Sequence, residues 1–177
     1  MTYEIKYSNR KTISIKITRE ATIQVFAPYG TDEGKIEQLM KSHESWILSH
    51  LEKAQERVEA IPQLSEEEVS QLKKEAKEKL TAIVERFSKF MDLDYGRITI
   101  TAAKTRFGSC SSAGNLSFSY RCMFYPYEVQ EYIVVHELSH LVHMDHSKDF
   151  YKLVSSVLPD YKKREKYLKL PIGTPYR

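Results

Sequence analysis

The feature that most constrains this chain is a histidine-rich run at residues 136–146, His-Glu-Leu-Ser-His-Leu-Val-His-Met-Asp-His. It holds four of the six histidines in the sequence. His136 and His140 are four residues apart, so an α-helix places both imidazoles on one face, one turn from each other. There they can bind a single ion. The run therefore predicts a helix that carries a metal site.

Glu137 follows the first of these histidines and would project beside the same face. From there it can reach a water held by the metal, but not easily the metal itself. Zinc lowers the pKa of its bound water to about 7, and a nearby carboxylate can take a proton as that water attacks a carbonyl carbon. The pattern His-Glu-x-x-His thus predicts Zn²⁺ as the cofactor and Glu137 as the catalytic base.

A third ligand is needed, because a catalytic zinc usually has three protein ligands and one open position. His143 would lie near the same face if the helix continued. His146 comes after the expected helix end, where the chain can turn back towards the ion. The spacing His-x3-His-x5-His is that of the metzincin signature, although His143 stands where that signature has glycine. We expect His136, His140 and His146 to bind the metal, with His143 as the alternative third ligand.

The composition is that of an ordinary globular protein, with 177 residues, 41% hydrophobic and 29% charged. No apolar run is long enough to span a bilayer, and residues 1–6 lack the pattern of a secretory signal. We therefore expect a soluble, cytoplasmic protein without a membrane partner. Cys110 and Cys122 match no common zinc-ligand spacing, so we expect two reduced thiols.

The charge balance is mildly basic, with a net charge of +3 and a pI near 8.7. This pI lies below the value of about 9 that is typical of a nucleic-acid-binding domain. A nucleic acid partner is therefore permitted but not required, and the oligomeric state is left open.

Periodicity predicts an α+β fold that begins with short antiparallel strands in the first thirty residues, where apolar and polar residues alternate. A helix capped by Thr31 should run to about Glu59, with Trp46 in the core. Ser65 and Glu68 form a capping box that should open a second long helix, ending near residue 91.

A small antiparallel sheet should follow, made of a strand at 97–101 and a returning strand at 116–120 around a turn at 111–115. The metal-binding helix should begin near Pro126 and end near His143, packed beside this sheet. A last helix should be capped by Ser147 and end near residue 159. We expect the whole chain to form one domain, residues 1–177, with an N-terminal part at 1–61 and a catalytic part at 62–177.

Several segments together resemble the YgjP-like metal-dependent hydrolases, which are relatives of the SprT/Spartan-type zinc proteases. The resemblance covers most of the chain and is carried by residues 10–15, 27–28, 46–47, 106–111, 114–118, 134–141, 146–147 and 150–151. It implies a zincin-type metallopeptidase domain that binds zinc through His136, His140 and His146, with Glu137 as base and a peptide or protein as substrate.

The resemblance also gives expectations for residues around the site. Phe107 stands where the family commonly has tryptophan, a conservative departure. Tyr151 stands at an aromatic position that should pack behind the site. Arg106 and Asn115 either line the substrate cleft or fix the hairpin between the two strands.

Two other classes of function compete with a peptidase. One is a metal-dependent endoribonuclease, because the YbeY-type ribonucleases share the spacing of three histidines. Those proteins have no glutamate directly after the first histidine, so Glu137 argues against this class. The other is a zinc-binding module without catalysis, which is disfavoured because structural zinc sites are usually closed by a fourth ligand. The sequence does not identify the natural substrate.

Overall fold

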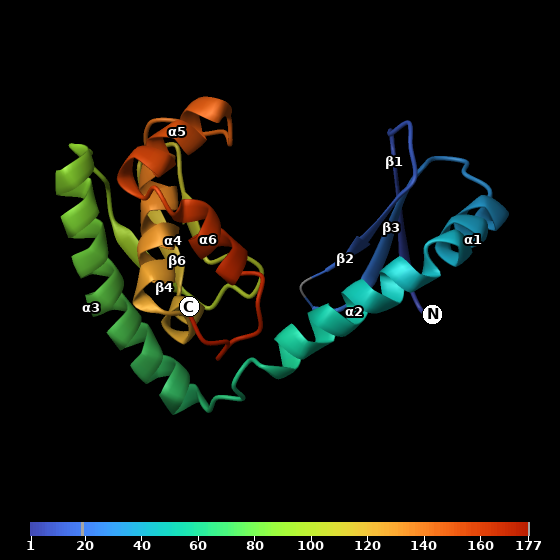
Figure 1. Cartoon of the computed structure of the whole chain (residues 1–177), viewed down its shortest axis with the longest axis horizontal. Coiled ribbons are helices and arrows are strands. Elements are labelled where there is room, and N and C mark those ends of the chain that lie inside the picture. The colour runs from blue at the N-terminus through green and yellow to red at the C-terminus, as the bar shows by residue number, and fades with distance from the viewer. Residues whose placement is uncertain (19, 177) are drawn as a thin grey trace. The chain divides into compact units, whose positions relative to one another are not determined.

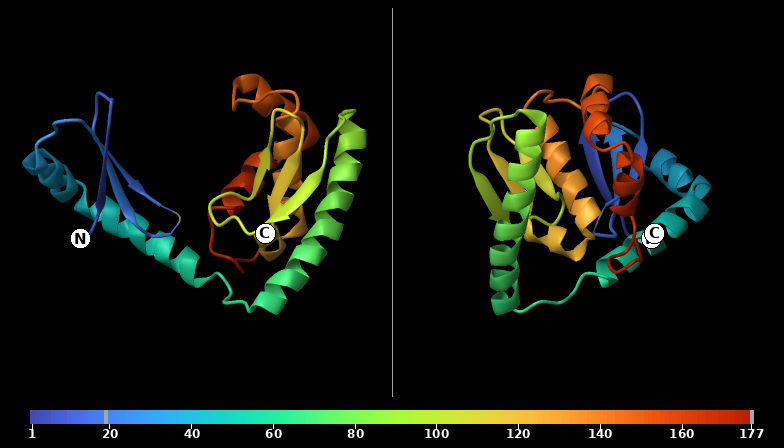
Figure 2. Two further views of the ribbon diagram at one scale, coloured as in Figure 1. Left: turned by 180° about the vertical axis from the view of Figure 1, so that it is seen from behind. Right: turned by 60° about the vertical axis from the view of Figure 1, so that its left-hand side comes forward.

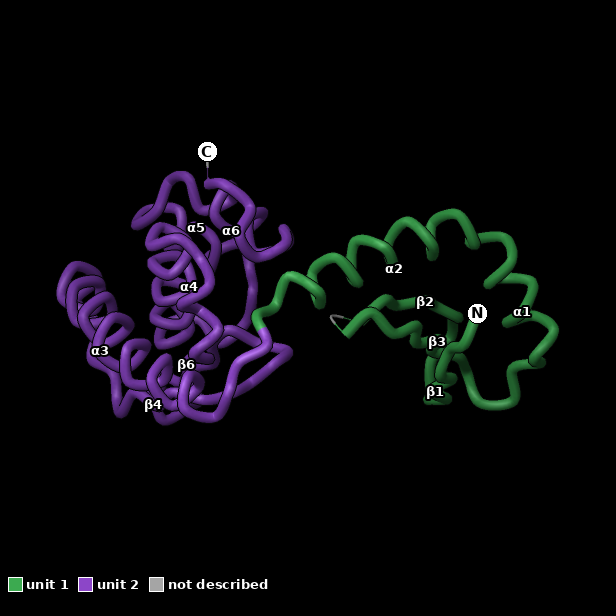
Figure 3. The backbone as a smooth tube through the Cα atoms, turned by 90° about the horizontal axis from the view of Figure 1, so that it is seen from below, with its two compact units in different colours: residues 1–62 green, residues 63–177 purple. Residues whose placement is uncertain are grey.

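The computed structural model describes residues 1–18 and 20–176. The chain divides into two compact units, Met1–Pro62 and Gln63–Arg177, which are coloured separately in Figure 3. Each unit contains a mixed three-stranded sheet and its own helices (Figure 1). The predicted α+β class is therefore confirmed. Within the described residues, no helix combines the length and the apolar composition that crossing a membrane requires.

The first unit contains strands β1 (Glu4–Ser8), β2 (Ser14–Ile17) and β3 (Ile23–Pro28), followed by helices α1 (Glu33–Ser42) and α2 (Glu44–Glu59). The central strand is β3, which alternates buried and half-buried residues along its length. Its buried face packs against apolar side chains of the two helices to form a core, whose buried members are Ile23, Val25, Ala27, Ile36, Met40 and Ile47.

The prediction that these strands are all antiparallel was wrong for one pair. β2 is antiparallel to β3, but β1 is parallel to it, and the order is β1-β3-β2. Alternation of apolar residues shows which side chains face the core, but it is the same for either strand direction. The most apolar strand, β3, took the central position, and the two more polar strands lie at its edges.

The single helix predicted over residues 31–59 is interrupted at His43, which ends α1 and precedes α2. Buried residues continue at helical spacing across the interruption, so periodicity did not reveal it. The cap is Asp32, whose side chain accepts a hydrogen bond from the Lys35 backbone N–H, and not Thr31. Trp46 was wrongly placed in the core: it is 42% exposed and stacks on the ring of His50.

The second unit opens with α3 (Glu66–Met91), which has the predicted capping box between Ser65 and Glu68. Strands β4 (Ile98–Thr101), β5 (Gly108–Cys110) and β6 (Leu116–Ser119) follow, then the 3-10 helix η1 (Tyr120–Phe124). The remaining helices are α4 (Tyr127–Ser139), α5 (Lys148–Val157) and α6 (Tyr161–Tyr167). Figures 1 and 2 show α3 and α4 side by side, with the strands of this sheet next to them.

The sheet of the second unit is also mixed. β5 and β6 form an antiparallel hairpin, whereas β4 is parallel to β6, so the wholly antiparallel sheet predicted for this region was wrong. The partner of the returning strand across the turn is β5, a three-residue strand too short for alternation to reveal. β6 is central and buries Leu116 and Phe118 against the main core.

Candidate active site

The helix that carries the site, α4, begins after Pro126 and ends at Ser139. It is four residues shorter than predicted, so His136 lies in its last turn and His140 is the first residue beyond it. The backbone N–H groups of Val142 and His143 both bond back to the Ser139 carbonyl oxygen, which turns the chain sharply. Because of this turn, the segment after the helix can bring a further histidine back to the helix face.

That further histidine is His146. One ligand atom from each of His136, His140 and His146 lies within 4.8 Å of the others. The Nε2 atoms of His136 and His146 are 3.0 Å apart. Among the described residues, no cysteine or carboxylate joins this group, and neither does His143. The three side chains that the sequence singled out are thus brought together at one point.

Neighbouring groups hold the second ring nitrogen of two of the three imidazoles. Nδ1 of His140 lies 2.9 Å from the carbonyl oxygen of His143. Because a carbonyl oxygen can only accept, this nitrogen must carry the proton, which leaves Nε2 with its lone pair free for a metal. Nδ1 of His136 lies 3.5 Å from the hydroxyl of Tyr132, one turn earlier on α4. His143 thus contributes its backbone carbonyl oxygen, which fixes the ring of His140.

Phe150 supports the three rings from α5. It is fully buried, and its ring centroid lies 4.9, 4.6 and 5.0 Å from those of His136, His140 and His146. This packing restricts the imidazoles to one arrangement. Tyr151, the next residue, contacts Phe150 and His146, as expected for an aromatic residue that packs behind the site.

The charges of the site favour metal binding. Burial, together with the neighbouring His140 and His146, lowers the pKa of His136 to about 4. The imidazole is therefore neutral at pH 7, and neutral imidazole is the form that binds a metal. Three imidazole nitrogen donors on a buried aromatic support fit a zinc-type ion, which takes nitrogen and sulfur ligands.

Glu137 follows His136 on α4 but does not join the histidine group. The side chain is buried, and burial raises its pKa to about 8, while the nearby Arg106 guanidinium acts in the opposite direction. A divalent cation next to this carboxyl would act in the same direction as Arg106 and bring the pKa below 8. Glu137 is thus placed to hold or release a proton near neutral pH.

Strand β5 passes directly against the Glu137 side chain. A Cβ atom built on Gly108 would lie 2.5 Å from Oε1 of Glu137 and 2.7 Å from its Cδ. Such distances are far inside van der Waals contact, so the carboxyl occupies the space that any larger residue at position 108 would need. The sequence suggested no role for Gly108, because a glycine in a strand does not reveal what approaches it.

Asn115 and the two cysteines, which the sequence analysis also considered, have structural roles. Oδ1 of Asn115 accepts a hydrogen bond from the Arg97 backbone N–H at 3.1 Å, and its own backbone N–H donates to Ser111 Oγ at 3.1 Å. Of the two roles considered for Asn115, it therefore fixes the hairpin and joins it to β4. Both cysteines are free thiols, and burial raises the pKa of Cys122 to about 12.

Comparison with known proteins supports the resemblance found in the sequence. The family profile of the YgjP-like metallopeptidase domain matches residues 11–73 and 62–170. No curated protein sequence matches significantly. Similar solved structures include the metallopeptidase zymogen of Pyrococcus abyssi abylysin, at 22% identity and a TM-score of 0.47, over 50% of this chain and 90% of that chain.

A second similar structure is the metallopeptidase zymogen of Methanocaldococcus jannaschii jannalysin, at 20% identity and a TM-score of 0.45. It is matched over 50% of this chain and 92% of that chain. The family profile, by contrast, extends over both units of the chain and well beyond half of its length. The chain belongs to the YgjP-like family of metallopeptidase domains.

Proposed function

We propose that this protein is a zinc-dependent peptidase in which His136, His140 and His146 hold the metal and Glu137 is the general base. One observation carries the proposal. Three imidazole nitrogens converge on one point, while Glu137, the residue directly after His136, is buried and does not join the ligand group. A structural zinc site would have a fourth protein ligand, and among the described residues no fourth candidate lies close enough to join the group.

When bound, zinc supplies Lewis acidity, which lowers the pKa of a coordinated water to about 7 and polarises a carbonyl group. The protein's own residues supply the proton handling. The Glu137 carboxylate accepts a proton from the attacking water and can return it to the amine nitrogen of the leaving group. Its buried position beside β5 keeps the carboxyl at one place relative to the three imidazoles.

The sheet next to α4 supports a peptide as the substrate. β5 is the last strand in the order β4-β6-β5, so its outer backbone groups have no partner among the described strands of that sheet. An extended peptide could pair with this edge by strand addition. Since Gly108 of β5 lies against Glu137, a peptide bound there would run past the base and the histidine group.

The proposal is tested by incubating the zinc-loaded protein with a complex peptide library, beside an RNA pool, with Glu137→Gln as the matched control. Gln keeps the size of the side chain but cannot accept the proton. We expect cleavage of peptides only, and a loss of turnover of about 10²–10⁴-fold in the variant. Zinc content and folding should stay the same. Full activity of Glu137→Gln, or cleavage of RNA alone, would contradict the proposal.

The ligand assignment has its own test by metal analysis. Wild type should hold one zinc per chain, because the three imidazoles form a single group. His146→Ala should lose the metal, whereas His143→Ala should keep it, since His143 contributes its backbone carbonyl oxygen and not its ring. Retention of zinc by His146→Ala would show that the third ligand is another residue.

A further inference from the structure

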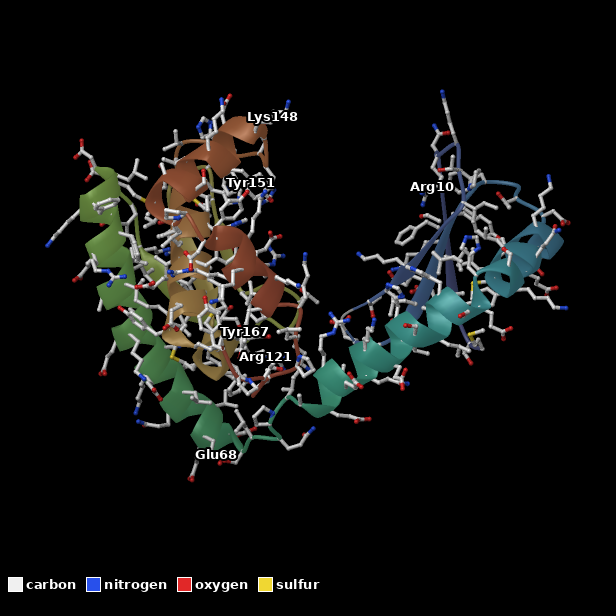
Figure 4. All side chains as sticks on the ribbon, viewed as in Figure 1. Arg10, Glu68, Arg121, Lys148, Tyr151 and Tyr167 are labelled. Atoms are coloured by element: carbon white, nitrogen blue, oxygen red, sulfur yellow. The ribbon has the colours of Figure 1, made fainter. Side chains whose placement is uncertain are left out.

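The surface of α5 next to the histidine group contains a hollow of about 360 Å³. Its walls come from His146, from Lys148, Tyr151 and Lys152 of α5, and from Tyr161 of α6. Lys148 and Tyr151 are labelled in Figure 4, where both lie on α5. His146 belongs both to the proposed metal site and to the wall of the hollow. The hollow therefore borders the proposed metal site at His146.

Aromatic rings form part of the wall. The rings of Tyr151 and Tyr161 lie nearly parallel, with centroids 5.8 Å apart and an angle of 23° between their planes. The imidazole of His146 continues this surface, 6.2 Å from Tyr151. Both tyrosines are half-buried, so their positions are fixed while part of each ring faces the hollow. A flat aromatic side chain has large complementary surfaces to stack on here.

Two lysines also belong to the wall of the hollow. The Lys152 ammonium lies 2.8 Å from the Asp149 carboxylate and forms an ion pair with it. Burial raises the pKa of Tyr151, and the nearby Glu165 carboxylate raises it further. The methylene chains of the two lysines can cover an apolar group.

We propose that this hollow is a substrate subsite that binds a large aromatic side chain of the peptide, close to the scissile bond. The inference rests on the proposed peptidase function. An extended peptide advances about 3.3 Å per residue. The 6.2 Å between the rings of His146 and Tyr151 therefore corresponds to about two residues. The aromatic side chain therefore belongs to the first or the second residue on one side of the cleaved bond.

The test compares matched peptides that differ at single positions around the cleaved bond. At the position that reaches the hollow, Phe or Tyr should give a kcat/KM roughly 10–100-fold above Ala, mostly through KM, as expected for filling an apolar pocket. Glu should gain nothing over Ala. In Tyr151→Ala and Tyr161→Ala, the ratio of Phe to Ala should fall towards one, with zinc content unchanged.

The control is Tyr127→Ala, which removes an exposed tyrosine at the start of α4, away from the hollow, and should keep the full ratio. Binding of the same peptides to zinc-loaded Glu137→Gln, measured by calorimetry, separates the two proposals. Preferential binding of the Phe peptide without any cleavage by wild type would overturn the peptidase function but support the subsite. Equal binding of the Phe and Ala peptides, or a preference that survives both tyrosine variants, would overturn the subsite. A preference for Glu would overturn it as well.

Discussion

Gly108 of β5 and Glu137 of α4 occupy adjoining space. The carboxyl fills the volume where a side chain on Gly108 would begin, 2.5 Å from Oε1. Catalytic groups must be placed to within a fraction of an ångström, and a misplacement of about 1 Å can cost roughly 10²-fold in rate. A backbone without Cβ at this position lets the edge strand lie directly against the Glu137 carboxyl.

The first prediction concerns Gly108→Ala. The added methyl group should push the Glu137 carboxyl aside, because the strand backbone on one side and α4 on the other leave the methyl group no room. We expect kcat to fall by roughly 10²-fold, with KM and zinc content nearly unchanged. Ser109→Ala is the matched control on the same strand and should keep its activity. An active Gly108→Ala protein would show that Glu137 does not need this position.

The second prediction concerns pH in the metal-free protein. The unfolded chain releases the Glu137 proton near pH 4.5, whereas the folded protein keeps it to about pH 8 because the group is buried. Between these values the folded state binds more protons, so its stability falls as pH rises. His136 acts in the opposite direction. Folding lowers its pKa from 6.5 to about 4, so the stability rises as pH increases between these two values.

Of these two groups, only Glu137 therefore changes the stability with pH between pH 6.5 and 8. Urea unfolding of the metal-free protein should show a free energy of unfolding that decreases over this range. The decrease should be much smaller in Glu137→Gln, because Gln does not titrate. An identical slope in both proteins would mean that the Glu137 carboxyl is already ionised in the folded state.

How far the site could be predicted follows from the residues themselves. Spacing predicted that His136, His140 and His146 come together, as they do, because a metal demands particular atoms at particular separations. The role of Glu137 as base was predicted from the same spacing and stays a proposal. Spacing could not reveal Gly108, Tyr132 or Phe150, since they act by contact with a residue from another element or another turn. Glycine, tyrosine and phenylalanine are common in strands and helices, so their presence alone does not indicate a role in the site.

At the scale of the elements, an ion network joins α4 to α3 and α6. Glu131 of α4 pairs with Arg164 of α6 at 2.6 Å and also with Arg86 of α3. Arg164 pairs in addition with Asp160 at 2.9 Å. The side chains of Glu131 and Arg164 are only 13% and 12% exposed, so water screens their attraction poorly. Three helices are thereby fixed to one another.

The third prediction is that Glu131→Gln destabilises the second unit. Arg164 keeps Asp160 as a partner, so the loss should be about 2 kcal/mol, below the 3–5 kcal/mol typical of a broken buried pair. Lys79→Ala, which removes an exposed pair with Glu75 on α3, should cost about 0.5 kcal/mol or less. Chemical denaturation measures both. Equal effects of the two variants would mean that the network is as weak as a surface pair.

The elements also show where local sequence signals stop. The caps at Ser65 and Ser147 were predicted correctly, because an N-cap is a contact between residues three apart. The end of α4 at Ser139 was missed. The residues after it, Leu141 to His143, are compatible with a helix, and the turn is stabilised by the bond from His140 to the His143 carbonyl oxygen. The direction of β1 and β4 was also missed, because it depends on a partner strand that lies far away in the sequence.

At the scale of the whole molecule, residues 1–18 and 20–176 contain two hydrophobic cores, and none of these residues belongs to both. All members of one lie between Tyr3 and Leu51, and all members of the other lie between Leu64 and Tyr176. The proposed metal site and the hollow are built entirely from the second unit. That both units act as one catalytic domain over residues 1–177, as the sequence suggested, stays a prediction.

Separate cores have a consequence for how the protein melts. Cooperative unfolding extends only as far as the packing that couples residues, so each core defines its own melting unit. Calorimetry should resolve two heat-absorption peaks. Ile47→Ala, in the first core, should shift one peak downwards, and added zinc should raise only the other, because a ligand stabilises the unit that binds it. A single peak that responds to both would show that the two cores melt together, and that substitutions around α2 reach the catalytic unit.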